Sequence, residues 1–219
     1  MKKINIVELK KLAKQLREPN GDAGVELSEK MYRSNFNMTA RTFELLLLQK
    51  NDHLLELGHG NARHLKHFFE KATISYTGLE ISETMQEEAS KINQILINNF
   101  DVQFKHYDGS SIPFADNSFD KIMTINTIYF WEKPIGLLLE MYRVLKKDGV
   151  LAVCFADEKF MESLPFVAYG FQLYDENNFK KLVAETPFQI MQHQRFKEYV
   201  ESKTGDFVER TFSTFLLKK

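Results

Sequence analysis

A glycine turn directly after an apolar run is the feature of this sequence best suited to hold a ligand. The run 53–57 is followed by Gly58, His59 and Gly60, and then by a segment of helical character at 62–71. Glycine accepts backbone angles that other residues avoid, and it lets a ligand approach without a Cβ in the way. A strand, a glycine turn and a helix start in this order predict a loop that binds a nucleotide or nucleoside.

Two residues near this turn narrow the choice of ligand. Glu56 stands two positions before Gly58, where a carboxylate would repel a pyrophosphate and favour a positively charged ligand. The dinucleotide pattern needs a third glycine at position 63, which is Arg63 in this chain. We therefore expect a nucleoside that is not a dinucleotide. An NAD(P)-binding oxidoreductase is the alternative, and Glu56 and Arg63 argue against it.

Two further acids follow apolar runs. Glu80 ends the second run, 22 positions after Gly58, and an acid at about this distance can accept hydrogen bonds from ribose hydroxyls. Asp108 follows the third run beside Gly109, where its carboxylate could accept from an adenine amino group. The structural alternatives are a solvated neighbour of a helix cap for Glu80 and a simple turn residue for Asp108.

The elements that must position these acids alternate between strand and helix. This alternation predicts an α/β domain with a mostly parallel sheet, whose ligand lies outside the carboxyl ends of the strands. Ser82 is a plausible cap of the second helix, and Gly149 is expected just past the third. We expect strands at 53–57, 74–79, 102–107, 119–125 and 150–155, and helices at 62–71, 82–97 and 134–145.

The zones on either side of this alternation differ from it. Residues 1–50 are expected to form a helical segment or cap on a domain that covers 51–219. The C-terminal zone holds ten of the 19 phenylalanines, between Phe155 and Phe215, and is expected to add strands to the same sheet. In the N-terminal zone we expect a helix break at 18–21, then either a flap over the ligand or a loop between helices at 32–38, and a helix at 39–48 capped by Thr39. In the C-terminal zone we expect a helix at 175–185 and extended runs at 188–199 and 207–217 around a turn at 203–206.

Composition excludes several classes of protein. The 219 residues are 43% hydrophobic and 27% charged, which suits a folded globular chain. The net charge of -1 gives no strong field to attract nucleic acid. A single cysteine, Cys154, excludes an intramolecular disulfide and a multi-cysteine zinc site. No run approaches the ~20 apolar residues of a membrane helix, so we expect no membrane insertion and a cytoplasmic location. A homo-oligomer is compatible with this sequence.

Four blocks together resemble the class I S-adenosylmethionine-dependent methyltransferases, in particular the branch that includes the ubiquinone and menaquinone C-methylases and many small-molecule methyltransferases. The blocks stand in the family's order and spacing over about half of the chain. The third is similar to the family pattern "D…lPF.d.sFD" and the fourth to "E..RVLkPGG". They are 54–62, 77–82, 108–120 and 140–149.

The resemblance implies a cofactor, a fold and a reaction. The cofactor is S-adenosylmethionine, and the reaction is methyl transfer to a small-molecule acceptor; a non-catalytic cofactor-binding protein is the alternative. The implied fold is a three-layer, doubly wound, Rossmann-like sheet of seven mostly parallel strands in the order 3-2-1-4-5-7-6, with N-terminal helices. The implied cofactor-binding residues are Glu56, Gly58, His59, Gly60, Glu80, Ile81, Asp108, Gly109 and Asn126.

On the acceptor side, Tyr32, Tyr129, Trp131 and Phe171 are expected to line the substrate pocket, with plain packing as the alternative. Aromatic faces there could stabilise a sulfonium or a cationic substrate. No catalytic residue is assigned. His59, Tyr129 and Asp108 are the candidates for a general base, and an acceptor that is already nucleophilic needs none.

Some residues carry no chemistry in this interpretation. His64 and His67 lie one helical turn apart and are expected to face solvent, and no metal is expected. The chain departs from the family at Ala62, where many members have glycine, and at Lys147-Asp148, where many have Pro-Gly. Alanine is small, so no loss of binding is expected from the first departure, and the second concerns the fold more than the site.

Overall fold

A computed structural model describes residues 5–201 and 207–219 of the chain. Its centre is one seven-stranded sheet in the order β3-β2-β1-β4-β5-β7-β6, which confirms the predicted topology. β7 runs antiparallel between β5 and β6, while the pairs from β3 to β5 are parallel. The strands are β1 (His53–Leu57), β2 (Ser75–Glu80), β3 (Val102–His106), β4 (Phe119–Ile125), β5 (Leu145–Ala156), β6 (Gln189–Glu201) and β7 (Phe207–Lys218).

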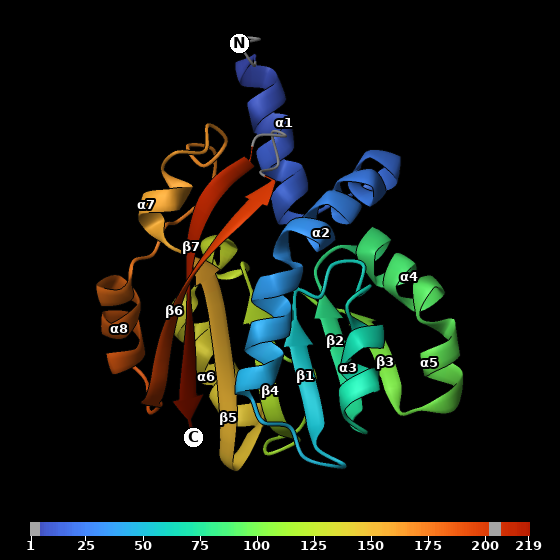
Figure 1. Ribbon diagram of the computed structural model, residues 1–219. Coiled ribbons are helices and arrows are strands. Elements are labelled where there is room, and N and C mark those ends of the chain that lie inside the picture. The colour runs from blue at the N-terminus through green and yellow to red at the C-terminus, as the bar shows by residue number, and fades with distance from the viewer. Residues whose placement is uncertain (1–4, 202–206) are drawn as a thin grey trace.

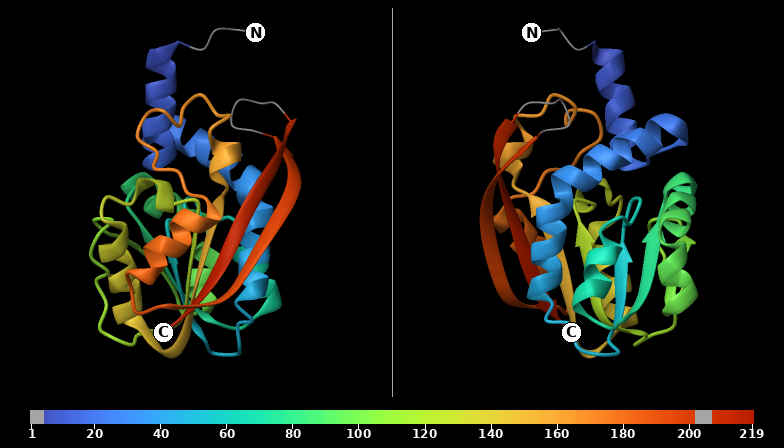
Figure 2. Two further views of the ribbon diagram at one scale, coloured as in Figure 1. Left: turned by 90° about the vertical axis from the view of Figure 1, so that its left-hand side faces the viewer. Right: turned by 45° about the vertical axis from the view of Figure 1, so that its right-hand side comes forward.

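Helices cover both faces of this sheet (Figures 1 and 2). α2, α3 and α4 contribute Met38, Phe68 and Ala89 to one apolar cluster, while α6 and α8 contribute Leu138 and Val183 to another. None of the helices within the described ranges is both long and apolar enough to cross a bilayer. The helices are α1 (Ile6–Arg17), α2 (Gly21–Leu45), α3 (Leu65–Lys71), α4 (Glu83–Ile92), α5 (Gln94–Asn99), the 3-10 helix η1 (Ile128–Phe130), α6 (Pro134–Val144), α7 (Glu158–Met161) and α8 (Glu176–Ala184).

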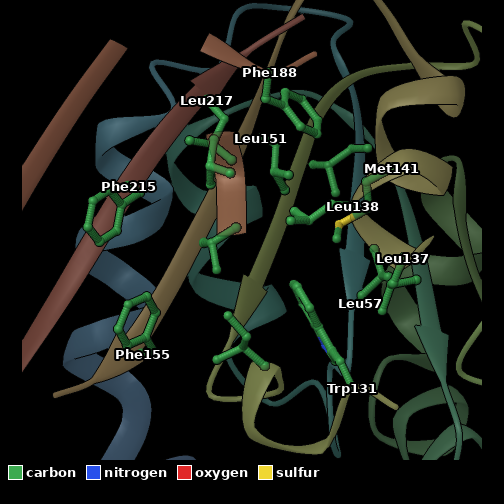
Figure 3. Packing of buried hydrophobic residues seen from close by; sticks show 14 of the residues in the cluster. Leu57, Trp131, Leu137, Leu138, Met141, Leu151, Phe155, Phe188, Phe215 and Leu217 are labelled. Atoms are coloured by element: carbon green, nitrogen blue, oxygen red, sulfur yellow. The ribbon is translucent and has the colours of Figure 1, made fainter. Parts of the chain in front are cut away.

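The phenylalanine-rich C-terminal zone packs largely inside the molecule. Phe155 on β5 and Phe215 on β7 are fully buried, and their rings stack with centroids 5.9 Å apart (Figure 3). Phe179 of α8 packs against both rings. The predicted strands of this zone therefore join the same sheet and extend its core. The predicted turn at 203–206 lies outside the described residues.

The N-terminal zone differs from the prediction. α2 begins at Gly21, so Thr39 lies inside a helix and does not cap one, and the expected loop at 32–38 is helical. The helix break at 18–21 is confirmed between α1 and α2. Met38 and Phe43 of α2 share a core cluster with residues of the sheet. The division of the chain at residue 50 stays a prediction.

Smaller differences concern the ends of elements. The single helix predicted at 82–97 is divided at Asn93 into α4 and α5, although Ser82 does cap α4 by accepting from the Met85 N–H. β5 begins at Leu145, so Gly149 lies inside this strand and not in a connection after α6. Asp148 beside it adopts a left-handed φ of 63°, a conformation that glycine accepts more readily. A glycine, which many members of the resembled family have here, would adopt this backbone conformation more easily.

The carboxyl ends of the parallel strands meet under the N-terminal helices. In Figure 1 these strands point upward, and α1 with the first half of α2 lies above their ends. The backbone polar groups at this edge no longer pair within the sheet, which is why ligands in open α/β folds bind there. The fold thus brings the predicted site residues to the edge that α1 and α2 cover.

Candidate functional site

A cleft of about 610 Å³ lies at this edge of the sheet. Its volume falls in the usual range for sites that enclose a small molecule. All nine residues proposed from the sequence to hold the cofactor line it, although their individual roles stay predictions. These residues are Glu56, Gly58, His59, Gly60, Glu80, Ile81, Asp108, Gly109 and Asn126.

The glycine turn has its shape for two different reasons. Gly58 has a φ of 73°, and a Cβ there would lie 2.3 Å from Cγ2 of Thr127, so the position accepts only glycine. Gly60 has a φ of 56°, and a Cβ there would meet nothing within 4 Å, because the position faces open space. Gly58 therefore allows the turn to pack against the end of β4, while Gly60 leaves room beside the cleft.

Glu80 at the end of β2 holds this turn in place. Its Oε2 accepts the Gly60 N–H at 2.9 Å, and its Oε1 accepts the N–H groups of Ile81 and Ser82 at 2.8 and 3.2 Å. Burial raises the pKa of Glu80, and these three hydrogen bonds only partly oppose the rise. A ligand that donates further hydrogen bonds to this carboxylate would stabilise its charged form.

Glu56 belongs to a buried cluster behind the turn. Its Oε2 accepts from Nε2 of His64 at 2.8 Å and from the Tyr76 hydroxyl at 2.6 Å. Burial acts to raise the pKa of Glu56, but attraction to His64 and these two hydrogen bonds outweigh it, so the net pKa is lowered. Its Oε1 accepts no hydrogen bond from the part of the chain that the structure describes. Glu56 therefore stays ionised and keeps one oxygen free for a ligand.

The predicted exposure of the histidines is wrong for His64. This ring is only 7% exposed because Glu56, eight positions earlier, binds it, whereas His67 is half-buried. Within residues 5–201 and 207–219, no three His, Cys, Asp or Glu side chains are grouped in a way that could hold a metal ion. His64 therefore orients Glu56 from within the core.

His59 lies inside the turn with its ring against the sheet. Its Nδ1–H donates to the Gly60 carbonyl at 2.7 Å, while the buried Nε2 has no partner among the described residues. A Cβ on Gly78 would lie 2.5 Å from Cδ2 of this ring, so β2 carries a glycine where the ring sits. Burial lowers the pKa of His59 to about 4, so the imidazole is neutral near neutral pH. Its contacts favour a structural role over that of a general base.

Backbone N–H groups anchor Asp108 within its own loop and Asn126 at the end of β5. Oδ1 of Asp108 accepts the N–H groups of Ser110 and Ser111, which lowers the pKa of this exposed carboxyl. Asn126 follows β4 with a left-handed φ of 58°, and its Oδ1 accepts the Ala156 N–H at 3.1 Å. This bond fixes the amide, whose Nδ2 lies 3.4 Å from the Met38 sulfur.

The four aromatic residues predicted for the acceptor side divide between two cavities. Tyr32 and Trp131 line the large cleft, and Nε1 of Trp131 donates to Thr127 Oγ1 at 3.1 Å. Tyr129 and Phe171 line a second, apolar cavity of about 80 Å³. Burial raises the pKa of Tyr129 far above its usual value, so its hydroxyl stays protonated and cannot serve as a base.

Sequence reasoning predicted a flap over the cofactor at 32–38 but missed that one continuous helix face forms this wall of the cleft. α2 presents Ser28, Met31, Asn35 and Thr39 to it, besides Tyr32, at spacings of three to four residues that are typical of one helix face. Nothing in this mixture of small and polar residues signals an apolar helix face, so only a helix prediction over 21–45 could have revealed the wall. Arg63, in contrast, does not line the cleft, because its Nε donates to Glu29 of α2.

Comparison with known proteins matches the central part of the chain to one protein family. Residues 55–153 match a family model described as a methyltransferase domain. An O-methyltransferase of Pyrenophora dematioidea is 23% identical over 177 residues, which is 77% of this chain and 66% of that protein. A demethylmenaquinone methyltransferase of Staphylococcus epidermidis is 36% identical over 102 residues, 45% of this chain and 38% of that protein. The chain thus matches at most about two thirds of the length of either relative.

Solved structures agree on the fold. The methyltransferase in a complex with the Trm112 methyltransferase activator of Haloferax volcanii superposes with a TM-score of 0.72 at 15% identity. The match covers 95% of this chain and 97% of that one. At such low identity the likeness concerns the fold, which here extends over nearly the whole chain.

Proposed function

The chain belongs to the class I S-adenosylmethionine-dependent methyltransferases, and we propose that it transfers a methyl group from S-adenosylmethionine to a small-molecule acceptor. One observation supports this proposal most strongly. Three carboxylates, Glu56, Glu80 and Asp108, line one cleft around a glycine turn that has no third glycine. The lysine and arginine that line the same cleft, Lys133 and Arg17, come from the loop before α6 and the end of α1.

The residues of the cleft fit this cofactor. S-adenosylmethionine has a sulfonium, a ribose and an adenine but no phosphate, so carboxylates can replace a phosphate-binding cradle. We assign Glu80 to the ribose hydroxyls and Asp108 to the adenine amino group. Glu56, with its free Oε1, and Asn126 are assigned to the methionine part. In the bound state the cofactor supplies a methyl group that is already activated by its positive sulfur.

The chain mainly has to align the two reactants and exclude water. Leu16 of α1 and Met31 and Tyr32 of α2 line the cleft from the side of the N-terminal helices. When bound, the cofactor would supply its methyl carbon to a lone pair of the acceptor and would keep the electron pair of the carbon–sulfur bond on sulfur. A proton on the attacking atom, where there is one, would be lost to bulk solvent after the product leaves the cleft.

A transfer assay tests the activity. Extracts of small metabolites are incubated with the protein and methyl-labelled S-adenosylmethionine, and labelled products are separated by mass. We expect label in a low-mass product, lost in Gly58→Arg because this residue closes the turn, and kept in Glu83→Gln, whose exposed side chain does not line the cleft. Label in RNA alone, or cofactor binding without transfer to any fraction, would contradict the proposal.

A further inference from the structure

The second cavity adjoins the cofactor cleft. The two share five lining residues from α1, α2, the end of β4 and η1. These residues form the border between the two cavities, so a group in the smaller one lies next to the cleft. The shared residues are Leu16, Met31, Asn35, Asn126 and Phe130.

The walls of this second cavity are mainly apolar. Phe130 and Phe171 meet edge to face with centroids 4.6 Å apart, and Phe166 lies 5.6 Å from Phe171. Met161 and Leu164 complete the side formed by residues 156–171. A cavity of about 80 Å³ is smaller than the roughly 150 Å³ that encloses benzene, so it admits one edge of an apolar ring whose remainder lies toward the adjoining cleft.

The charged group deepest in this cavity is already neutralised. Nε and Nη2 of Arg210 donate to Oε1 of Glu198 at 2.9 and 2.6 Å, and Nη2 also donates to the Ser34 carbonyl. Arg210 is 4% exposed, so this pair is withdrawn from solvent. The remaining lining carboxylate, Glu201, is exposed and can keep its water. A charged ligand would lose hydration here without gaining a buried counter-charge, which is unfavourable.

Most of the uncharged polar groups of the cavity also have partners. The Tyr129 hydroxyl lies 2.9 Å from the Ala156 carbonyl oxygen and 3.1 Å from Oδ1 of Asn126, and either can accept its proton. The Ser34 hydroxyl donates to the Met31 carbonyl. A ligand with many hydrogen-bonding groups would therefore find few partners.

We propose that the acceptor is a small uncharged molecule that inserts the edge of an apolar ring into the cavity between α2, η1 and residues 156–171. This inference rests on the proposed methyltransferase function, because it assigns the substrate class of the same site. The acceptor's reacting atom then faces the cleft where Asn126 and Phe130 border both cavities. Selection comes from desolvation, which disfavours charged analogues of the same size.

The test uses three probes of one shape and different charge: benzyl alcohol, benzylammonium and benzoate. Each is titrated, with calorimetric or NMR detection, into the protein saturated with S-adenosylhomocysteine. We expect benzyl alcohol to bind about tenfold or more tightly than either ion, because the ions lose hydration on burial. Equal or tighter binding of an ion, or no binding of any probe to protein that does bind S-adenosylhomocysteine, would overturn the inference.

A substitution in the smaller cavity tests the same inference, because it should shift the binding preference toward an anion. Leu164 lines only the smaller cavity, so Leu164→Lys should shift the preference toward benzoate while the affinity for S-adenosylhomocysteine stays the same. Leu139→Lys, at an exposed position of α6 outside both cavities, is the matched control and should keep the wild-type preference. A shift in the control as large as in Leu164→Lys would count against the inference. Failure to bind S-adenosylhomocysteine would instead refute the proposed function.

Discussion

The carboxylate of Glu80 shapes the glycine turn and also faces the cleft. It accepts three backbone N–H groups, from Gly60, Ile81 and Ser82, while its pKa is raised by burial. The turn is therefore organised before a ligand arrives. Additional donors from a ligand would lower this pKa again, which couples binding to the loss of a proton.

This coupling predicts a pH dependence of binding. The affinity for S-adenosylhomocysteine should be full above the raised pKa of Glu80 and fall by about tenfold per pH unit below it, since the protonated acid must first ionise. Glu80→Gln should bind about 10- to 100-fold more weakly, with a flat pH profile. Glu83→Gln is the control at a nearby exposed acid. Titrations at several pH values decide, and an unchanged affinity in Glu80→Gln would refute the ribose assignment.

His59 should make the stability of the fold depend on pH. Burial lowers its pKa to about 4, from 6.5, so the unfolded chain binds more protons than the native one in this range. The stability that the neutral, buried His59 contributes is complete above about pH 6.5 and is lost as the pH falls. Between pH 7 and pH 5 this effect lowers the free energy of unfolding by about 2 kcal/mol. The free energy of unfolding, measured by urea denaturation, should fall less steeply with decreasing pH in His59→Asn than in the wild type. His106→Asn, which replaces an exposed ring, should show the wild-type dependence. Equal slopes in all three would contradict the burial of His59.

At the scale of elements, Ser82 joins α4 to the segment that leads into α2. Its hydroxyl oxygen accepts the Met85 N–H at 3.1 Å, and the hydroxyl donates to the Pro19 carbonyl. Pro19 lines the cleft, so this cap also positions one rim of the site. A single residue thus stabilises a helix and holds the N-terminal cover in place.

Removing this cap should destabilise the protein measurably. Ser82→Ala leaves the Met85 N–H and the Pro19 carbonyl without their partners and should lower the free energy of unfolding by about 1 to 2 kcal/mol. Ser90→Ala, inside the same helix, should change it by only a few tenths of a kcal/mol, because alanine favours a helix interior. Urea denaturation of both variants measures the difference. Equal effects would show that Ser82 is not an effective cap.

The sequence predicted the strands better than it predicted α2. β1 and β4 have the predicted bounds, because short apolar runs between turn residues identify buried strands well. α2 was expected to begin at Thr39 because the rest of its buried face consists largely of small polar residues and glycine, including Gly24, Ser28 and Ser34. Apolar periodicity does not detect such a helix face. His64 was misjudged for a related reason, since its partner Glu56 becomes its neighbour only in the fold.

At the scale of the whole molecule, side chains join α2 to the last two strands of the sheet. Arg210 of β7 binds Asn35 and the Ser34 carbonyl of α2, and Glu198 of β6 accepts from Asn37. The last two strands therefore hold the helix that forms one wall of the cleft. The resemblance correctly implied the strand order, but this connection between distant segments depends on side chains that no family motif includes.

Breaking the Arg210–Glu198 ion pair should destabilise the protein. Arg210→Met leaves the 11%-exposed Glu198 carboxylate without its ion partner and should lower the free energy of unfolding by about 3 kcal/mol. Combining it with Glu198→Gln should recover part of the loss, because no unpaired charge then remains buried. Urea unfolding of the single and double variants measures both. A loss below about 1 kcal/mol in Arg210→Met would show that the pair does not hold α2 to the last two strands.

The central claim is that the acidic cleft accepts a phosphate-free adenosine derivative and rejects a pyrophosphate one. Calorimetric titration of the wild-type protein with S-adenosylhomocysteine and, separately, with NAD tests this claim most directly. The arrangement of Glu56, Glu80 and Asp108 around the glycine turn predicts saturable binding of S-adenosylhomocysteine and no heat of binding for NAD. Saturable binding of NAD with none of S-adenosylhomocysteine would contradict it.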